Sequence, residues 1–135
     1  AESTDPSYIY GKTPTGGKSA LKITNNDESV DMVAVLTKGG DKTPIFAIYI
    51  PSKTTSSIPN MVTGMFNLYY MTGVDWNEQK HEFNDAVFYK VASPLIVGEN
   101  SEYLVQLYAN SGNTGGRIKK IEEGVFPKIS GTSES

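Results

Sequence analysis

Residues 30–37 read Val-Asp-Met-Val-Ala-Val-Leu-Thr, and this stretch decides the fold class. Its apolar residues alternate with a period of two, which is the spacing of a β-strand. One face holds Val30, Met32, Ala34 and Leu36, and the other holds Val33 and Val35. A strand that is apolar on both faces is buried on both, so we predict that 30–37 is a central strand.

The same alternation continues on both sides of this strand. The turn residues 25–28 (Asn-Asn-Asp-Glu) precede it, and 38–41 (Lys-Gly-Gly-Asp) follow it as a hairpin loop. Further strands are predicted over 20–24, 45–50, 65–70, 86–91, 102–108 and 118–126, with a polar, edge-like segment at 52–57. Short strands without crossover helices predict an all-β fold: an antiparallel two-sheet β-sandwich, Ig-like or jelly-roll-like, of about eight strands.

One short helical turn is also predicted. Asp75 is placed to act as an N-cap, and Glu78 stands three residues later, as in a capping box. We therefore expect one or two helical turns within residues 75–82.

The 135 residues predict a single domain with two attached segments. We place the β-sandwich at 19–127, a polar tail at 128–135 and a Pro- and Gly-rich N-terminal arm at 1–18. The arm contains the apolar triplet Tyr8-Ile9-Tyr10. Such a triplet can add a strand to another copy's sheet, so these three residues are the predicted subunit contacts. The alternative is that the arm packs on its own domain.

Composition excludes several classes of function. The chain has no cysteine and a single histidine, which excludes disulfide frameworks, zinc–thiolate sites and cysteine nucleophiles. Its net charge of −3 argues against a nucleic-acid partner, and no apolar stretch is long enough for a membrane span. We therefore expect no enzymatic activity, no cofactor and no metal, although calcium binding by loop oxygens (Asn25, Asn26, Asp27, Asp31) stays open.

Two motifs are tempting but weak. Residues 11–19 (Gly-Lys-Thr-Pro-Thr-Gly-Gly-Lys-Ser) resemble a phosphate-binding loop, but Gly11 stands one residue too far from Gly17, and a strand pattern follows where a helix is needed. We interpret this segment as a flexible hinge between arm and core. His81 lies in a charged stretch and is interpreted as a solvated loop histidine.

Trp76 and the eight tyrosines are the aromatic candidates for binding. Aromatic rings can stack on sugars or anchor protein contacts. Most tyrosines fall in predicted strands and are therefore expected in the core or on a sheet face. Trp76 follows a strand, where it either caps one end of the sandwich or stacks on a ligand.

Several segments resemble an uncharacterised β-sandwich domain of prokaryotic surface proteins. They are Leu21–Asn25, Asp31–Leu36, Ile58-Pro59, Gly64–Trp76 (Gly-Met-Phe-Asn-Leu-Tyr-Tyr-Met-Thr-Gly-Val-Asp-Trp) and Phe83, so the resemblance covers about residues 20–127. The family usually has a tight Ile-Pro-x-Gly turn, which Met61-Val62-Thr63 lengthens here. The resemblance implies a β-sandwich and a non-enzymatic role, and it offers no catalytic residues.

The expected function is that of a secreted structural protein. Absent cysteine together with abundant Thr, Ser, Asn and Tyr is typical of extracellular or cell-surface proteins that do without disulfides. We expect copies of the chain to form a homopolymer, a filament or surface assembly, by donor-strand complementation through the arm. The alternative is a β-sandwich module that binds carbohydrate or a partner protein through Trp76.

Overall fold

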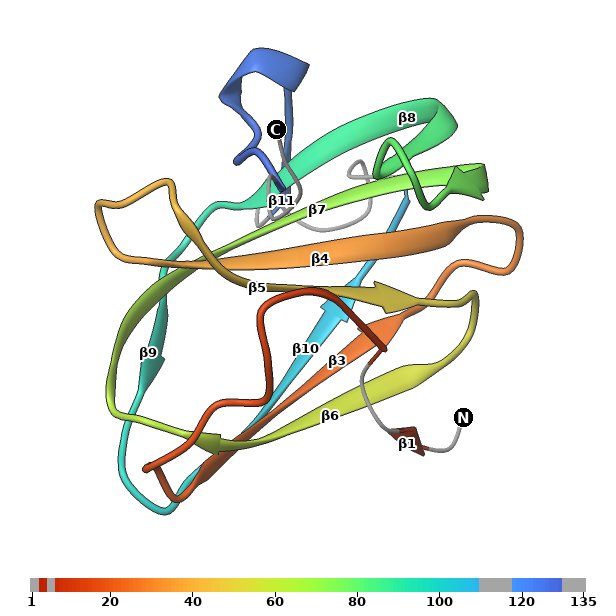
Figure 1. The fold of residues 1–135 in the computed structure, drawn as a ribbon. Coiled ribbons are helices and arrows are strands. Elements are labelled where there is room, and N and C mark those ends of the chain that lie inside the picture. The colour runs from red at the N-terminus through yellow and green to blue at the C-terminus, as the bar shows by residue number, and fades with distance from the viewer. Residues whose placement is uncertain (1–2, 5–6, 110–117, 130–135) are drawn as a thin grey trace.

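The computed structural model describes residues 3–4, 7–109 and 118–129. They form two β-sheets stacked face to face, so the predicted all-β sandwich is confirmed (Figure 1). Of the predicted tail, only 128–129 lie within the described residues, and arm residues 1–2 and 5–6 lie outside them. The smaller sheet has the order β1 (Ser3–Thr4), β6 (Thr55–Met61), β3 (Ser19–Asn25), β10 (Glu102–Leu107). The larger has the order β11 (Ile118–Ile121), β8 (Glu82–Val91), β7 (Gly64–Asn77), β4 (Asp31–Lys38), β5 (Pro44–Ile50), β2 (Ser7–Tyr10), and β9 (Leu95–Val97) also pairs with β7.

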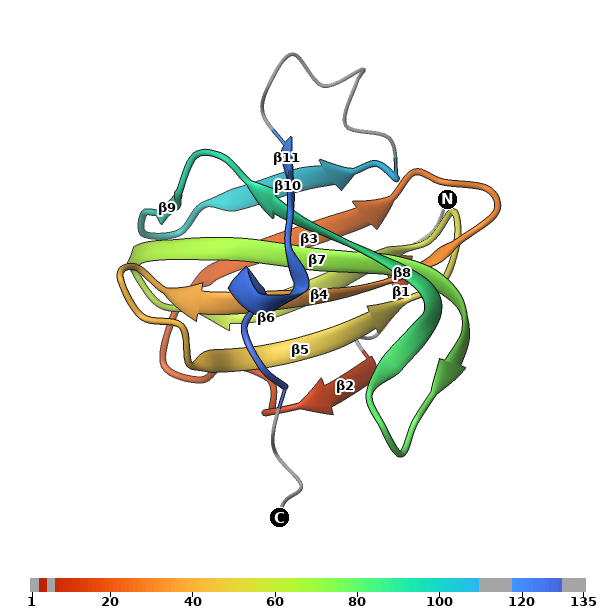
Figure 2. The same ribbon diagram turned by 90° about the horizontal axis from the view of Figure 1, so that it is seen from above.

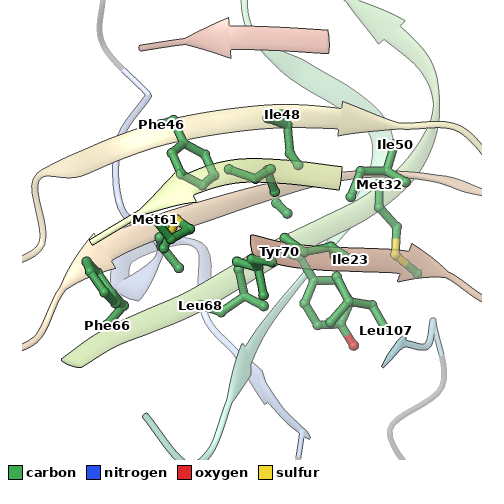
Figure 3. Packing of buried hydrophobic residues seen from close by; sticks show 14 of the residues in the cluster. Ile23, Met32, Phe46, Ile48, Ile50, Met61, Phe66, Leu68, Tyr70 and Leu107 are labelled. Carbon is green, nitrogen blue, oxygen red and sulfur yellow. The ribbon is translucent and has the colours of Figure 1, made fainter. Parts of the chain in front are cut away.

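The predicted central strand is β4. It is hydrogen-bonded to β5 on one side and to β7 on the other. Met32, Ala34 and Leu36 point between the sheets into the main core, together with residues such as Phe46, Ile48 and Tyr70 (Figure 3). Val33 and Val35 point to the opposite face of the larger sheet and are also fully buried. We call the apolar group around them the outer cluster: Val33, Val35, Ala47, Tyr69, Met71, Phe83 and Phe126.

Two strand pairs depart from the antiparallel pattern. β10 runs parallel to β3, and the short β1 runs parallel to β6. The other pairs are antiparallel. In both parallel pairs the two strands are distant in sequence, so the connection between them is long enough for the crossover that parallel pairing needs.

The helical turn is not at the position that the sequence predicted. β7 continues through Asp75 to Asn77, a turn follows, and β8 begins at Glu82. Asp75 has a φ of 54°, whereas an N-cap residue has extended backbone, so the capping-box reading of 75–82 is wrong. Within the described residues the helical turn is a 3₁₀ turn at Glu123–Val125, which ends the strand predicted over 118–126 at Ile121. Among all the residues that the structure describes, no helix is long and apolar enough to cross a membrane.

Candidate functional site

The strand of the N-terminal arm, β2, lies at the edge of the larger sheet. It pairs antiparallel with β5 of the same chain, with Tyr8 opposite Ile48 and Tyr10 opposite Ala47 (Figure 2). A bulge between Tyr8 and Tyr10 shifts the register. The three predicted contact residues therefore lie on both faces of the larger sheet. Tyr8 packs against the main core, while Ile9 and Tyr10 pack against the outer cluster.

Tyr8 is the residue by which the arm enters the core. Its ring meets Phe46 edge-on, with centroids 5.7 Å apart and an interplanar angle of 89°. Its hydroxyl is buried and has no hydrogen-bond partner among the described residues. A buried, unpaired polar group costs roughly 1–3 kcal/mol. The arm is thus held by apolar contact and strand pairing but destabilised at one atom.

Two glycines fix the ends of the segment that joins β2 to β3. Gly11 has a φ of 77°, and a Cβ there would lie 2.4 Å from the carbonyl oxygen of Ile45. Gly17 donates its N–H to the Asn60 carbonyl at 3.2 Å, and a Cβ would lie 1.9 Å from the Met61 oxygen. Both glycines therefore allow close backbone approach. We call residues 12–16, between these fixed points, the linker.

Trp76 lies at the tip of the β7–β8 hairpin inside an aromatic group. Its ring centroid is 4.9 Å from that of Phe83, 5.9 Å from Tyr49 and 6.1 Å from His81, which is stacked at 10°. The indole N–H donates to Oε1 of Glu78 at 2.9 Å. The ring is half-buried and joins the hairpin tip to β5, next to the arm strand.

Tyr49 fixes the end of β5 beside the arm. Its hydroxyl donates to Oδ2 of Asp31 at 2.6 Å, and the other oxygen of Asp31 accepts the N–H of Ser52 at 3.0 Å. Burial, together with the hydrogen bond and charge of Asp31, raises the pKa of Tyr49 well above its usual value. The neutral phenol is therefore the form that this contact needs.

Of the four residues considered for calcium, Asn25, Asp27 and Asp31 have side-chain oxygens that accept hydrogen bonds from the chain's own donors. Asn25 donates its amide to the carbonyls of Val30 (3.0 Å) and Ile50 (3.1 Å), and its oxygen accepts the N–H of Asp27 at 2.9 Å. One oxygen of Asp27 accepts the N–H groups of Ser29 (2.8 Å) and Val30 (3.1 Å). Burial opposes ionisation of Asp27, but these hydrogen bonds outweigh it and lower its pKa. In the described ranges no three His, Asp or Glu residues gather as a metal site.

A pocket that the sequence did not predict lies on the outer face of the larger sheet. It separates the tip of the β7–β8 hairpin from the segment that follows the 3₁₀ turn. His81 Nδ1 lies 3.3 Å from the carbonyl oxygen of Ile129, which links the two walls. These residues are 48 positions apart, so no local pattern indicates that they meet. A local signal is the apolar pair Val125-Phe126, which follows the polar residues 122–124.

Comparison with known proteins assigns no family to this chain. No protein-family model, no curated protein and no solved structure matches it.

Proposed function

We propose that this chain is a secreted, non-catalytic structural protein whose copies assemble into an extracellular filament or surface layer by exchanging the N-terminal arm. The observation that favours this function is the way in which β2 is attached. It is a four-residue edge strand that pairs only with β5 among the described strands and is joined to the domain through a short linker.

The contacts of β2 are of a kind that a second copy can supply equally well. Pairing with β5 uses main-chain groups, and Tyr8 inserts beside Phe46, a residue that belongs to the domain and not to the arm. An arm released from its own β5 leaves an open strand edge that another copy's arm fits. Exchange of identical elements needs no new interface and, when it does not close on itself, produces a fibre.

The first experiment changes the linker and leaves the arm intact. Deleting Thr13, Pro14 and Thr15 shortens the linker between Gly11 and Gly17 from five residues to two. We expect the shortened linker to hinder docking of the arm on its own β5 more than docking on another copy. We expect this variant to form concentration-dependent oligomers in analytical ultracentrifugation and polymers in negative-stain microscopy. A control with the same three residues replaced by serine keeps the length and should behave like the wild type.

A folded deletion variant that stays monomeric at every concentration contradicts the proposal. That outcome favours the alternative, a monomeric module that binds carbohydrate or protein through Trp76. The alternative makes its own demand: glycan or protein binding must disappear in Trp76→Ala while the fold is retained.

A cross-linking experiment tests exchange directly, because the chain has no natural cysteine. Tyr10 and Ala47 are register partners, so Tyr10→Cys in one copy and Ala47→Cys in another are adjacent only if the arm crosses between copies. Oxidising the refolded mixture should give the mixed disulfide, identified by mass. A matched mixture of Ser29→Cys and Ala47→Cys, in which Ser29 is exposed, gives the background yield of mixed disulfide. A yield from the Tyr10→Cys mixture no higher than this background would contradict exchange.

A further inference from the structure

The pocket on the outer face of the larger sheet is separate from the arm strand. Its volume is about 230 Å³. The floor is apolar and comes from the sheet and the residues after the 3₁₀ turn, with Met71, Phe88 and Phe126. A closed cavity of about 150 Å³ lined by apolar side chains holds a benzene ring, and this pocket, although open to solvent, is larger. This pocket therefore has room for a branched or aromatic side chain together with the polar group that carries it.

The rim of the pocket carries two charges of each sign. Lys80 and Glu82 stand on the hairpin wall, and Glu123 and Lys128 stand on the opposite wall. All four side chains are exposed, and none forms an ion pair with another described residue. Each wall therefore offers one free ammonium and one free carboxylate at the edge of an apolar floor.

We propose that this pocket binds a free α-amino acid with an apolar side chain. The side chain of the ligand packs on Phe88 and Phe126, its carboxylate faces a lysine of the rim, and its ammonium faces a glutamate. The mixed rim selects a zwitterion over an ion of one sign, because a ligand with a single charge leaves like charges of the rim unopposed. Exposed ion pairs contribute little each, so we expect binding in about the millimolar range.

The reporter for this binding is built into the chain. Trp76 is the only tryptophan, and its ring is stacked on His81, which lines the pocket. The full chain is titrated with L-leucine and L-phenylalanine while Trp76 fluorescence and amide NMR shifts are recorded. We expect saturable changes centred on His81, Phe88 and Ile129.

Ligand analogues separate the contributions of the three groups. N-acetyl-leucine lacks the ammonium, leucinamide lacks the carboxylate, and glycine lacks the apolar side chain. We expect each charge-deleted analogue to bind about two- to fivefold more weakly than leucine, and glycine to produce no saturable change. Absence of saturation with leucine and phenylalanine up to their solubility limits overturns the proposal. Equal affinity of leucine and both charge-deleted analogues also overturns it.

Surface variants locate the site without threatening the fold. Glu123→Gln and Lys128→Gln should each weaken leucine binding about two- to fivefold. The matched controls Glu28→Gln and Lys119→Gln are exposed residues that do not line the pocket, and they should leave it unchanged. Equal affinity in the pocket variants and the controls shows that leucine binds elsewhere and overturns the assignment.

Discussion

Tyr8→Phe tests whether the arm is held against an energetic penalty. The substitution removes one buried hydroxyl that has no partner among the described residues and keeps the ring that meets Phe46 edge-on. Removing an unpaired buried polar group recovers roughly 1–3 kcal/mol. The equilibrium constant for local opening of the arm should therefore fall by about 5-fold at the lower figure and about 150-fold at the upper one.

Native-state hydrogen exchange measures this equilibrium at the amides of β2 and at those β5 amides that pair with it. We expect slower exchange at these amides in Tyr8→Phe, while amides in the middle of β7 change by no more than the gain in global stability. Unchanged or faster hydrogen exchange at β2 would refute the claim that the Tyr8 hydroxyl destabilises the docked arm. The hydroxyl would then have a hydrogen-bond partner in solution.

Tyr70→Phe is the matched control for the same chemical change. The hydroxyl of Tyr70 is paired, since it donates to the carbonyl oxygen of Tyr108 at 2.6 Å. Removing it abolishes a hydrogen bond and leaves a carbonyl unsatisfied, so we expect a loss of about 0.5–1.5 kcal/mol in the free energy of unfolding. The two variants should therefore differ in sign, which a general effect of losing a tyrosine hydroxyl does not explain.

Three further predictions concern the framework around the arm and the pocket. Gly73→Ala places a Cβ 2.3 Å from Cβ of Phe83. In urea titration it should lower the free energy of unfolding by about 1–3 kcal/mol. An unchanged urea midpoint would show that the hairpin can move to make room for the methyl group. Asn25→Asp replaces a buried amide that donates to two carbonyls with an acceptor, and should destabilise the fold by more than about 3 kcal/mol, also by urea titration. The pKa of Tyr49 is raised in the fold, so its neutral hydroxyl contributes to the free energy of unfolding. This contribution is fully present below about pH 10 and is lost as the pH rises further. Thermal melts should show this alkaline loss in the wild type and a shallower one in Tyr49→Phe.

The fold was predictable where side-chain pattern alone decides the structure. Residues 30–37 are apolar on both faces, and β4 is accordingly buried on both, between two neighbouring strands. The hairpin loop at 38–41 was also predictable from local sequence. Its turn needs a positive φ, and Gly40 adopts a φ of 81° there. Such features depend on residues that are close in sequence.

The prediction failed where tertiary contacts override local signals. Asp75 and Glu78 have the spacing of a capping box, but Trp76 and Phe83 pack against each other across the hairpin with centroids 4.9 Å apart. That contact requires extended strands on both sides of the turn. The outer-face pocket escaped prediction because its walls are joined by the contact between His81 and Ile129, which are 48 positions apart in the sequence.

The arm's contacts do not by themselves decide whether it docks on its own sheet or on another copy. If the exchanged arm makes the same contacts, the penalty at Tyr8 is equal in both states, so Tyr8→Phe slows exchange without changing its final balance. The balance then depends on the linker, because a short flexible linker gives an intramolecular partner an effective concentration in the millimolar range. Exchange between copies therefore requires either a crowded surface or a strained linker. Accordingly, changes in the length of the linker (residues 12–16), more than changes in the arm strand, should control assembly.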